Sequence, residues 1–314
     1  IYPGPPGVAT FIAPNVPHYF LWSALGDAVS YVAATEGGLA LAVSSLDGSL
    51  SEHPVAVGAP MFHAWSDDGA FLALHAGPRL ALFDRTTLAL TEVHDNTAGF
   101  RTPRFSASGD LLYAAPAGDG IALLARVASG DTRRLAVFDG GVALDVFTDE
   151  LFVAVTHQAD AALFDSLWRV AADGSGRECV WRGPFGAFWV APDGEAVVFL
   201  VPAQSGDGRV ALQARGRFGE ILGATESFVP SDDLRVASAF FDQYSLSHSP
   251  WSPGGDMFAV CGRLATDGVS ASFGDPIGDY VMTWRPVRSQ PLELLAPGTF
   301  ASFARRVAGD GATQ

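Results

Sequence analysis

The feature that most constrains the fold of this chain is a short pattern that recurs along almost its whole length. An aromatic residue is followed by Ser and then by a turn that contains Gly. The copies are Trp22-Ser-Ala-Leu-Gly-Asp, Trp65-Ser-Asp-Asp-Gly, Phe105-Ser-Ala-Ser-Gly-Asp and Trp251-Ser-Pro-Gly-Gly-Asp, with a weaker copy at Val190-Ala-Pro-Asp-Gly, directly after Trp189, and a degenerate copy without Gly at Phe147-Thr-Asp-Glu. Their spacings are 43, 40, 42, 43 and 61 residues. Self-similarity of this period indicates one supersecondary unit per copy.

Each copy predicts the same unit of four short strands. A strand ends at the aromatic residue, and Ser and Gly supply a tight turn in which Gly allows a positive φ. An apolar second strand follows at once, a third follows another turn, and a fourth runs back toward the next aromatic residue. The second strands read AVSYVAA, AFLALH, LLYAA, LFVAV, EAVVFL and MFAVC, and the third LALAVSS, RLALF, IALLAR, SLWRV, RVALQ and YVMTW. An antiparallel meander of about 40 residues has the size of one propeller blade.

Six aromatic turns therefore predict an all-β fold, a six-bladed β-propeller of four-stranded antiparallel blades. The repeated aromatic residues are expected to be buried as wedges between neighbouring blades: Trp22, Trp65, Phe105, Phe147 and Trp251. We expect one domain over residues 1–314, with extra terminal strands at 8–13 (VATFIA) and 299–304 (TFASFA) that complete the ring and remove exposed edges. A seventh blade, incomplete because the natural chain is longer, is the alternative.

The Trp-Ser-Pro-Asp-Gly-like turn, followed directly by an apolar strand, resembles the TolB-type, WD40-like propeller repeat. The same repeat builds the propeller domains of peptidases of the prolyl oligopeptidase type. The resemblance extends from about Val8 to Ala304. It implies a propeller, and it leaves the function open because one fold serves many functions.

The longest interval between aromatic turns carries about 20 extra residues. Ser231 is a suitable N-cap, and Asp232 and Asp233 suit the first turn of a helix. An apolar face from Leu234 to Phe240 predicts one short helix over 232–242. This helix should lie in the connection to an inner strand, at the mouth of the central channel. It is either a passive plug of the ring or a cap that contacts a ligand or partner.

The loops that lead into the inner strands should form one rim of the channel. The candidate binding residues on this rim are His18, Tyr19, His63, Arg101, Arg104, Asp145, Phe188, Asp242, Gln243, Tyr244 and His248. Arg and His beside aromatic residues suit a small anionic ligand or a protein partner with an acidic tail. Arg101 and Arg104 in particular should form a local positive spot on an acidic molecule. Three His can also make an open metal site, but we expect no metal and no other cofactor.

Composition excludes several function classes. The net charge is −15, with 34 acidic residues against 19 basic ones, and all of the basic residues are Arg. A general nucleic-acid partner is therefore not expected, nor is chemistry that needs a lysine amine. Cys179 and Cys261 have no metal-ligand spacing and read as buried apolar residues. No apolar run reaches the roughly 20 residues of a membrane-spanning helix.

Catalytic motifs are also missing from the sequence. It contains no G-x-S-x-G elbow, no H-E-x-x-H and no C-x-x-C. We therefore expect a non-catalytic binding or scaffold propeller. The alternative is the propeller domain of a prolyl-oligopeptidase-like serine peptidase whose catalytic domain lies outside this chain. The first residue is Ile1 rather than Met, which fits a cleaved signal peptide, and we expect an extracytoplasmic location in the periplasm or cell envelope.

Overall fold

The computed structural model describes residues 19–157, 163–264, 278–286 and 290–303. Its first four repeats each form a separate four-stranded antiparallel sheet, with the strands side by side in chain order. These sheets contain β1 (Tyr19–Trp22), β2 (Ala28–Thr35), β3 (Gly38–Ser45) and β4 (His53–Val57); β5 (Met61–Trp65), β6 (Phe71–Ala76), β7 (Arg79–Asp84) and β8 (Leu90–His94); β9 (Arg104–Phe105), β10 (Leu111–Ala117), β11 (Gly120–Arg126) and β12 (Thr132–Phe138); and β13 (Gly141–Phe147), β14 (Glu150–Thr156), β15 (Phe164–Ala171) and β16 (Arg177–Phe185). The predicted second and third strands of these units are confirmed.

The fifth and sixth repeats share one eight-stranded sheet. It contains β17 (Ala187–Val190), β18 (Ala196–Pro202), β19 (Val210–Gly216), β20 (Ile221–Ala224), β21 (Phe228–Pro230), β22 (Phe258–Leu264), β23 (Tyr280–Trp284) and β24 (Glu293–Pro297). The short strand β21 joins the two repeats, because Phe228 pairs with Val210 of β19 and with Leu264 of β22. The fifth and sixth repeats are therefore joined by strand pairs, whereas the first four repeats each form a sheet of their own.

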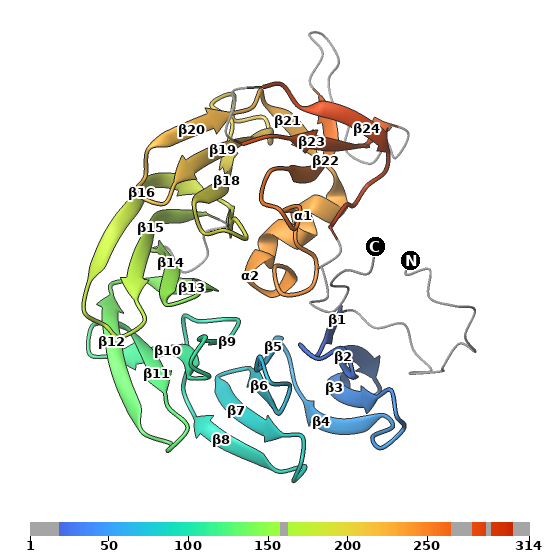
Figure 1. Ribbon diagram of the computed structural model, residues 1–314, viewed down its shortest axis with the longest axis vertical. Helices are drawn as coiled ribbons and strands as arrows, with labels where there is room; N and C mark the ends of the chain where they lie inside the picture. Colours follow the sequence, from blue (N-terminus) through green and yellow to red (C-terminus); the bar gives the residue numbers. More distant parts are fainter. Residues whose placement is uncertain (1–18, 158–162, 265–277, 287–289, 304–314) are drawn as a thin grey trace, which may run out of the picture.

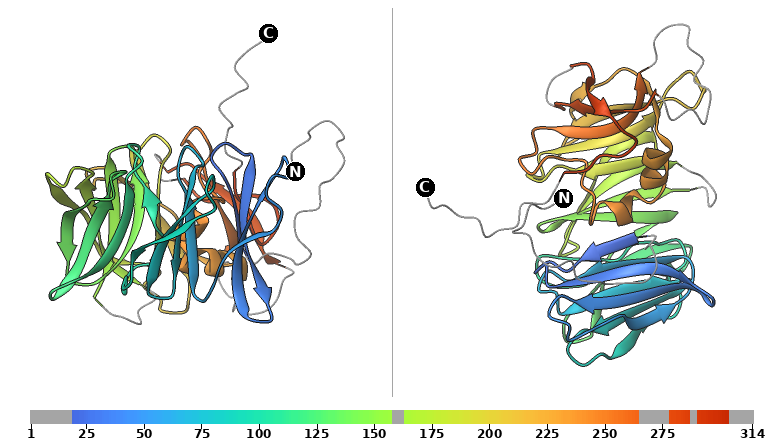
Figure 2. Two further views of the ribbon diagram at one scale, coloured as in Figure 1. Left: turned by 90° about the horizontal axis from the view of Figure 1, so that it is seen from below. Right: turned by 90° about the vertical axis from the view of Figure 1, so that its right-hand side faces the viewer.

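The sheets lie side by side in an arc around two short helices, with the first strand of each sheet on the inside (Figure 1). Figure 2 shows the molecule from two sides, with the strands seen along their length. Neighbouring inner strands are in contact from β1 to β5, β9, β13 and β17. One apolar cluster joins the first and second sheets, and another joins the second, third and fourth sheets. A third cluster joins the fourth sheet to the last one. The core is thus continuous from sheet to sheet, as in a propeller.

The repeated Ser has the same structural role in several turns. The backbone N–H of Ala28 donates to Ser23 Oγ, that of Phe71 donates to Ser66 Oγ, and that of Met257 donates to Ser252 Oγ. The repeated Gly is needed for the backbone, since Gly69 has a φ of +66°. In the copy without Gly, the turn is shortened to two residues, and Thr148 takes the positive φ of 51° between the paired Phe147 and Glu150.

Of the five repeated aromatic residues expected to be buried, Trp65 and Trp251 are buried, and Phe105 and Phe147 are only partly buried. Trp65 is 8% exposed and Trp251 is 2% exposed. Each indole N–H reaches the preceding repeat, donating to the carbonyl of Leu21 in the case of Trp65 and to that of Trp189 in the case of Trp251. Trp22 is different: it is 43% exposed, so the prediction of its burial is wrong. The physical reason is its place in the first sheet, because no apolar cluster of the described residues joins this sheet to the last one.

The helical insertion interrupts the inner strand of the last repeat. Pro230 pairs with Gly262 of β22, and Trp251 pairs with Phe258 at the other end of the same strand. Residues 231–248 between these two pairs leave the sheet; we call them the insert. The insert contains α1 (Asp232–Ala239) and α2 (Phe241–Tyr244) rather than the single helix expected over 232–242.

The helix begins as predicted, with Ser231 Oγ accepting a hydrogen bond from the backbone N–H of Leu234. It breaks at Phe240, which has a φ of −122° and a ψ of 35°, outside the helical range. The expected strand at 8–13 lies outside the described residues. Of the expected strand at 299–304, the structure describes 299–303, which form a single bridge between Phe303 and Ser249 instead of a strand.

Candidate functional site

The insert occupies the inside of the arc, where the predicted site residues converge. The helix α2 contacts the inner strands β5, β13 and β17, which come from three different sheets (Figure 1). Phe241 anchors it among aromatic rings: it is 1% exposed, and its ring centre lies 5.0 Å from that of Phe188. The sequence placed Phe188 on an open rim, whereas it is a fully buried core residue in contact with the insert.

Gln243 fixes the insert to β5 through the backbone of His63. Its Oε1 accepts from the His63 N–H at 2.9 Å, and its Nε2 donates to the His63 carbonyl at 2.9 Å. Gln243 is 5% exposed, so both hydrogen bonds are shielded from water. The amide thus acts like an added strand on the inner edge of β5, satisfying groups that no neighbouring strand reaches.

Two arginines of the third sheet bind the carboxyl and carbonyl groups of the insert. Arg101 forms an ion pair of 2.8 Å with Asp242 and donates to the Ala239 carbonyl. Arg104 donates to the carbonyl of Asp242 and to Ser245 Oγ. Its Nε lies 3.5 Å from a carboxylate oxygen of Asp145 on β13.

These contacts change the electrostatics that the sequence predicted. Arg104 is 3% exposed and Asp242 is fully buried. The two guanidinium groups face two carboxylates, those of Asp242 and Asp145, so the local charge is balanced. The expected positive spot at Arg101 and Arg104 is therefore neutralised from within the chain.

Tyr19, Tyr244 and His248 form an aromatic group beside this network. The Tyr19 ring centre lies 5.4 Å from that of Tyr244 and 6.4 Å from that of His248. The Tyr19 hydroxyl donates to the Gln243 carbonyl at 2.8 Å and lies 2.8 Å from Ser247 Oγ. Burial raises the pKa of Tyr19 above its usual value, so the phenol stays protonated and keeps donating.

His63 stands out within the site. It is 0% exposed, and neither ring nitrogen has a hydrogen-bond partner among the described residues. Burial lowers the pKa of His63 to about 3, because the charged imidazolium loses its hydration there. The ring is therefore neutral at physiological pH and packs edge-on against Tyr19, with 5.5 Å between ring centres.

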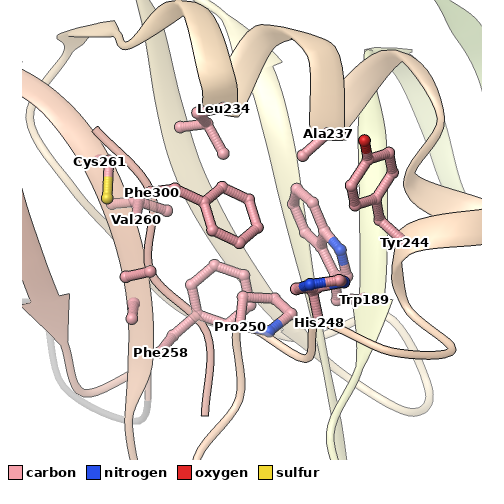
Figure 3. Close-up of a pocket in the computed structure, with 12 residues that line it drawn as sticks. Trp189, Leu234, Ala237, Tyr244, His248, Pro250, Phe258, Val260, Cys261 and Phe300 are labelled. Carbon is pink, nitrogen blue, oxygen red and sulfur yellow. The ribbon is translucent and has the colours of Figure 1, made fainter. Parts of the chain in front are cut away.

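A small apolar pocket lies between α1 and the last sheet (Figure 3). Leu234 and Ala237 line it from α1, Phe300 reaches into it, and Tyr244 and His248 lie at its side. Its volume is about 30 Å³, enough for about one water molecule. Burial also lowers the pKa of His248, which leaves this ring neutral.

A larger pocket, which we call the inner pocket, follows the inner strands toward the ends at which the aromatic turns begin. It has a volume of about 380 Å³. Its walls come from the ends of β13 and β17 and from the turns after Trp189 and Trp251. Ser245, directly after α2, also lines it. Trp189 and Pro250 form a wall that it shares with the small pocket. This volume falls in the range of small-molecule sites, roughly 300–1,000 Å³.

The sequence therefore predicted which residues converge, but not what they bind. Ten of the eleven predicted site residues surround the insert or belong to it, and His18 lies outside the described residues. Sequence reasoning missed Thr102, whose backbone N–H donates to Asp242 Oδ2, and three residues of the inner pocket: Ser245, Ser249 and Pro253. The last two could have been found from the repeat, since they flank the aromatic position 251 and therefore lie at the end of an inner strand.

Within the described ranges, no group of three or more His, Cys, Asp or Glu side chains is placed to hold a metal ion. The helices of the described part are too short to cross a membrane.

No protein-family model and no curated protein matches this sequence. Among solved structures, a prolyl endopeptidase is similar with a TM-score of 0.57 and 13% identity, over 88% of this chain and 41% of that chain. An oligogalacturonate lyase in complex with manganese gives 0.56 and 14%, over 88% and 76%. The β-propeller domain of Cps50 (Swd1) from Myceliophteria thermophila gives 0.54 and 12%, over 94% and 91%.

These likenesses show a β-propeller fold and nothing finer, because all of the identities are low. TolB chains are also similar, at TM-scores below 0.5, and this chain spans 53% of the length of one of them.

Proposed function

We propose that this chain is a non-catalytic β-propeller module that binds a ligand or protein partner on the inside of its ring. The proposal includes six blades in a single domain and an extracytoplasmic location, both based on the repeat and its resemblance to the TolB type. The observation that carries it is the insert. Its buried hydrogen bonds to β5 and the third sheet fill the inside of the ring where the inner strands begin, and the inner pocket is left where they end.

The same contacts support a narrower binding surface than the eleven residues expected from the sequence. His63, Arg104, Asp242 and Gln243 are at most 5% exposed, and their partners lie within the chain. They hold the insert in place, while a ligand meets the inner pocket, to which Asp145 contributes. In this proposal the insert fills the inside of the ring, and the binding site lies next to it. The insert therefore combines the two alternatives expected from the sequence, a passive plug and a cap that contacts a ligand or partner.

A photo-cross-linking experiment tests this function. 4-Benzoylphenylalanine replaces Pro253, an exposed residue at the inner pocket, or, as a control, Leu90, which is 46% exposed on the outer strand β8. We expect irradiated cells to give a discrete adduct from position 253 and none from position 90. The adduct should disappear when Val190→Trp narrows the pocket. Adducts from position 90 alone, or adducts at 253 that persist with Val190→Trp, contradict the proposal.

The second candidate is the propeller domain of a prolyl-oligopeptidase-like peptidase. The similarity to a prolyl endopeptidase, over 88% of this chain but only 41% of the other, favours it. The natural reading frame tests this alternative. A further segment with a G-x-S-x-G elbow supports the peptidase, and a reading frame without one excludes a catalytic domain of that kind.

A further inference from the structure

The inner pocket has one charged side chain among the described residues that line it, and that side chain is a carboxylate. Asp145 is 21% exposed there. The other polar side chains are the hydroxyls of Ser245 and Ser249. Neither Arg nor His belongs to this lining. A bound molecule therefore meets one negative charge and two hydroxyl groups, which can donate or accept hydrogen bonds.

The Asp145 carboxylate is incompletely paired. Its Oδ1 accepts the backbone N–H of Val146 at 3.0 Å. The nearest cation is Arg104, whose Nε lies 3.5 Å away and makes no hydrogen bond. At that distance the ion pair lacks the short, aligned geometry of a strong charge-assisted hydrogen bond. The carboxylate can therefore accept a further hydrogen bond from a ligand.

The neighbouring charges leave this carboxylate as the group that a ligand meets first. Arg101 is paired with Asp242 at 2.8 Å. Arg104 is 3% exposed and lies behind the pocket wall, where it bonds to Ser245. Among the described residues, Arg104 is the one cation within 4 Å of Asp145 and is already bonded to the insert, and the chain as a whole carries −15, which favours the approach of a cation.

The rest of the lining is mostly apolar. Phe147, Trp251 and Pro253 line the end of the pocket at the aromatic turns, together with Pro192 and Phe303. A carboxylate among mostly apolar side chains suits a molecule with a single cationic group on an apolar body. Aromatic rings beside the carboxylate add favourable cation–π contacts for an ammonium group.

From this geometry we propose that the inner pocket binds an organic ammonium: a protonated amine, hydrogen-bonded to Asp145, whose apolar or aromatic part packs against Phe147 and Trp251. The inference rests on the proposed binding function and replaces the anionic ligand expected from the sequence. The ammonium can belong to a small molecule or to a lysine side chain of a partner, and both share this chemistry.

Three probes of matched shape test the inference: phenethylamine, 3-phenylpropanoate and phenethyl alcohol. Their dissociation constants are measured by ligand-observed NMR titration with the full chain. The amine should bind about tenfold more tightly than the other two probes, the magnitude of one charge-assisted hydrogen bond. Its affinity should fall with added salt. The tripeptide Gly-Lys-Gly with blocked ends distinguishes a small-molecule amine from a lysine side chain of a partner. A pocket that binds a partner's lysine should bind the tripeptide, and a pocket for a small amine should not.

The decisive variant is Asp145→Asn, with Asp95→Asn as the matched control at an exposed carboxylate outside the pocket. Asp145→Asn should weaken amine binding about tenfold and leave phenethyl alcohol unchanged. The unchanged alcohol also shows that the variant is folded. Tighter binding of 3-phenylpropanoate than of the amine, or equal amine binding by Asp145→Asn, overturns the inference while leaving the binding function intact. Absence of binding by all probes also overturns it, and cross-linking at position 253 then judges the function separately.

Discussion

Trp65 and Trp251 occupy the same position in two repeats and make the same contact. Each buries its indole and donates its N–H to the inner strand of the preceding repeat. Trp22 has the same position in the first repeat, but 43% of its surface is exposed. Sequence reasoning could identify the position because it depends on the turn that follows. It could not identify the exposure, because that depends on a sheet far away in the sequence.

Trp65→Ala and Trp251→Ala should each lower the free energy of unfolding by about 3–5 kcal/mol, the usual cost of removing a buried Trp side chain. Trp22→Ala serves as the matched control and should cost about 1 kcal/mol or less. Urea unfolding followed by circular dichroism measures all three. Equal losses at Trp22 and Trp65 would mean that the indole of Trp22 is covered as well.

His63 gives a second prediction at the scale of a residue. In the native state its pKa is about 3, against about 6.5 in the unfolded chain. Between these values the unfolded state binds the proton and the native state does not. The free energy of unfolding therefore does not depend on the protonation of His63 above pH 6.5. It decreases as the pH falls from 6.5 toward 3, because the unfolded chain takes up the proton.

His63→Phe should stabilise the protein by about 1 kcal/mol at neutral pH, because it replaces two unpartnered buried nitrogens by an apolar ring. It should also flatten the fall in stability between pH 6.5 and pH 3. His94→Phe, at a partly exposed ring on β8, is the control and should change neither. The measurement is urea unfolding at a series of pH values. A destabilised His63→Phe variant with an unchanged pH dependence contradicts the assignment of a buried, unpaired imidazole.

At the scale of an element, the insert shows where sequence reasoning stops. Its helical start at Ser231 followed from local capping chemistry and is confirmed. Its position inside the inner strand of the last repeat depends on which residues of β22 pair on either side of it. The contact between Gln243 and His63 joins residues 180 positions apart, and no local pattern encodes it.

Gln243→Leu should release the insert from β5. Two buried backbone groups of His63 lose their partners, so stability should fall by about 2–3 kcal/mol. Amide hydrogen exchange over residues 232–248 should become faster, while β14 and β18 keep their protection. Val236→Ala, at an exposed position of α1, is the control within the same element. Unchanged exchange in Gln243→Leu would show that other contacts hold the insert.

At the scale of the whole molecule, the apolar clusters overlap from sheet to sheet. The fourth sheet contributes Leu144 and Val153 to one cluster and Phe152 and Ala154 to the next. Unfolding of one sheet therefore exposes the apolar residues that the neighbouring sheet packs against it. The repeat predicted the order of the strands, whereas the joined eight-stranded sheet arises from the pairing of Phe228 with both neighbours.

One unfolding transition should follow from this continuity. Calorimetry, Trp fluorescence and circular dichroism should report the same midpoint temperature, as expected when no part of the core unfolds alone. Two separated transitions would instead indicate two independent units and would contradict a single domain.

Amide hydrogen exchange with and without phenethylamine tests whether binding occurs at the inner pocket next to the insert. We expect slower exchange at 145–147, 189–192 and 249–253 in the presence of the amine, with no change in the outer strands β4, β8, β12 and β16. Protection confined to the outer strands, or absent from all three inner segments at saturating amine, would contradict it.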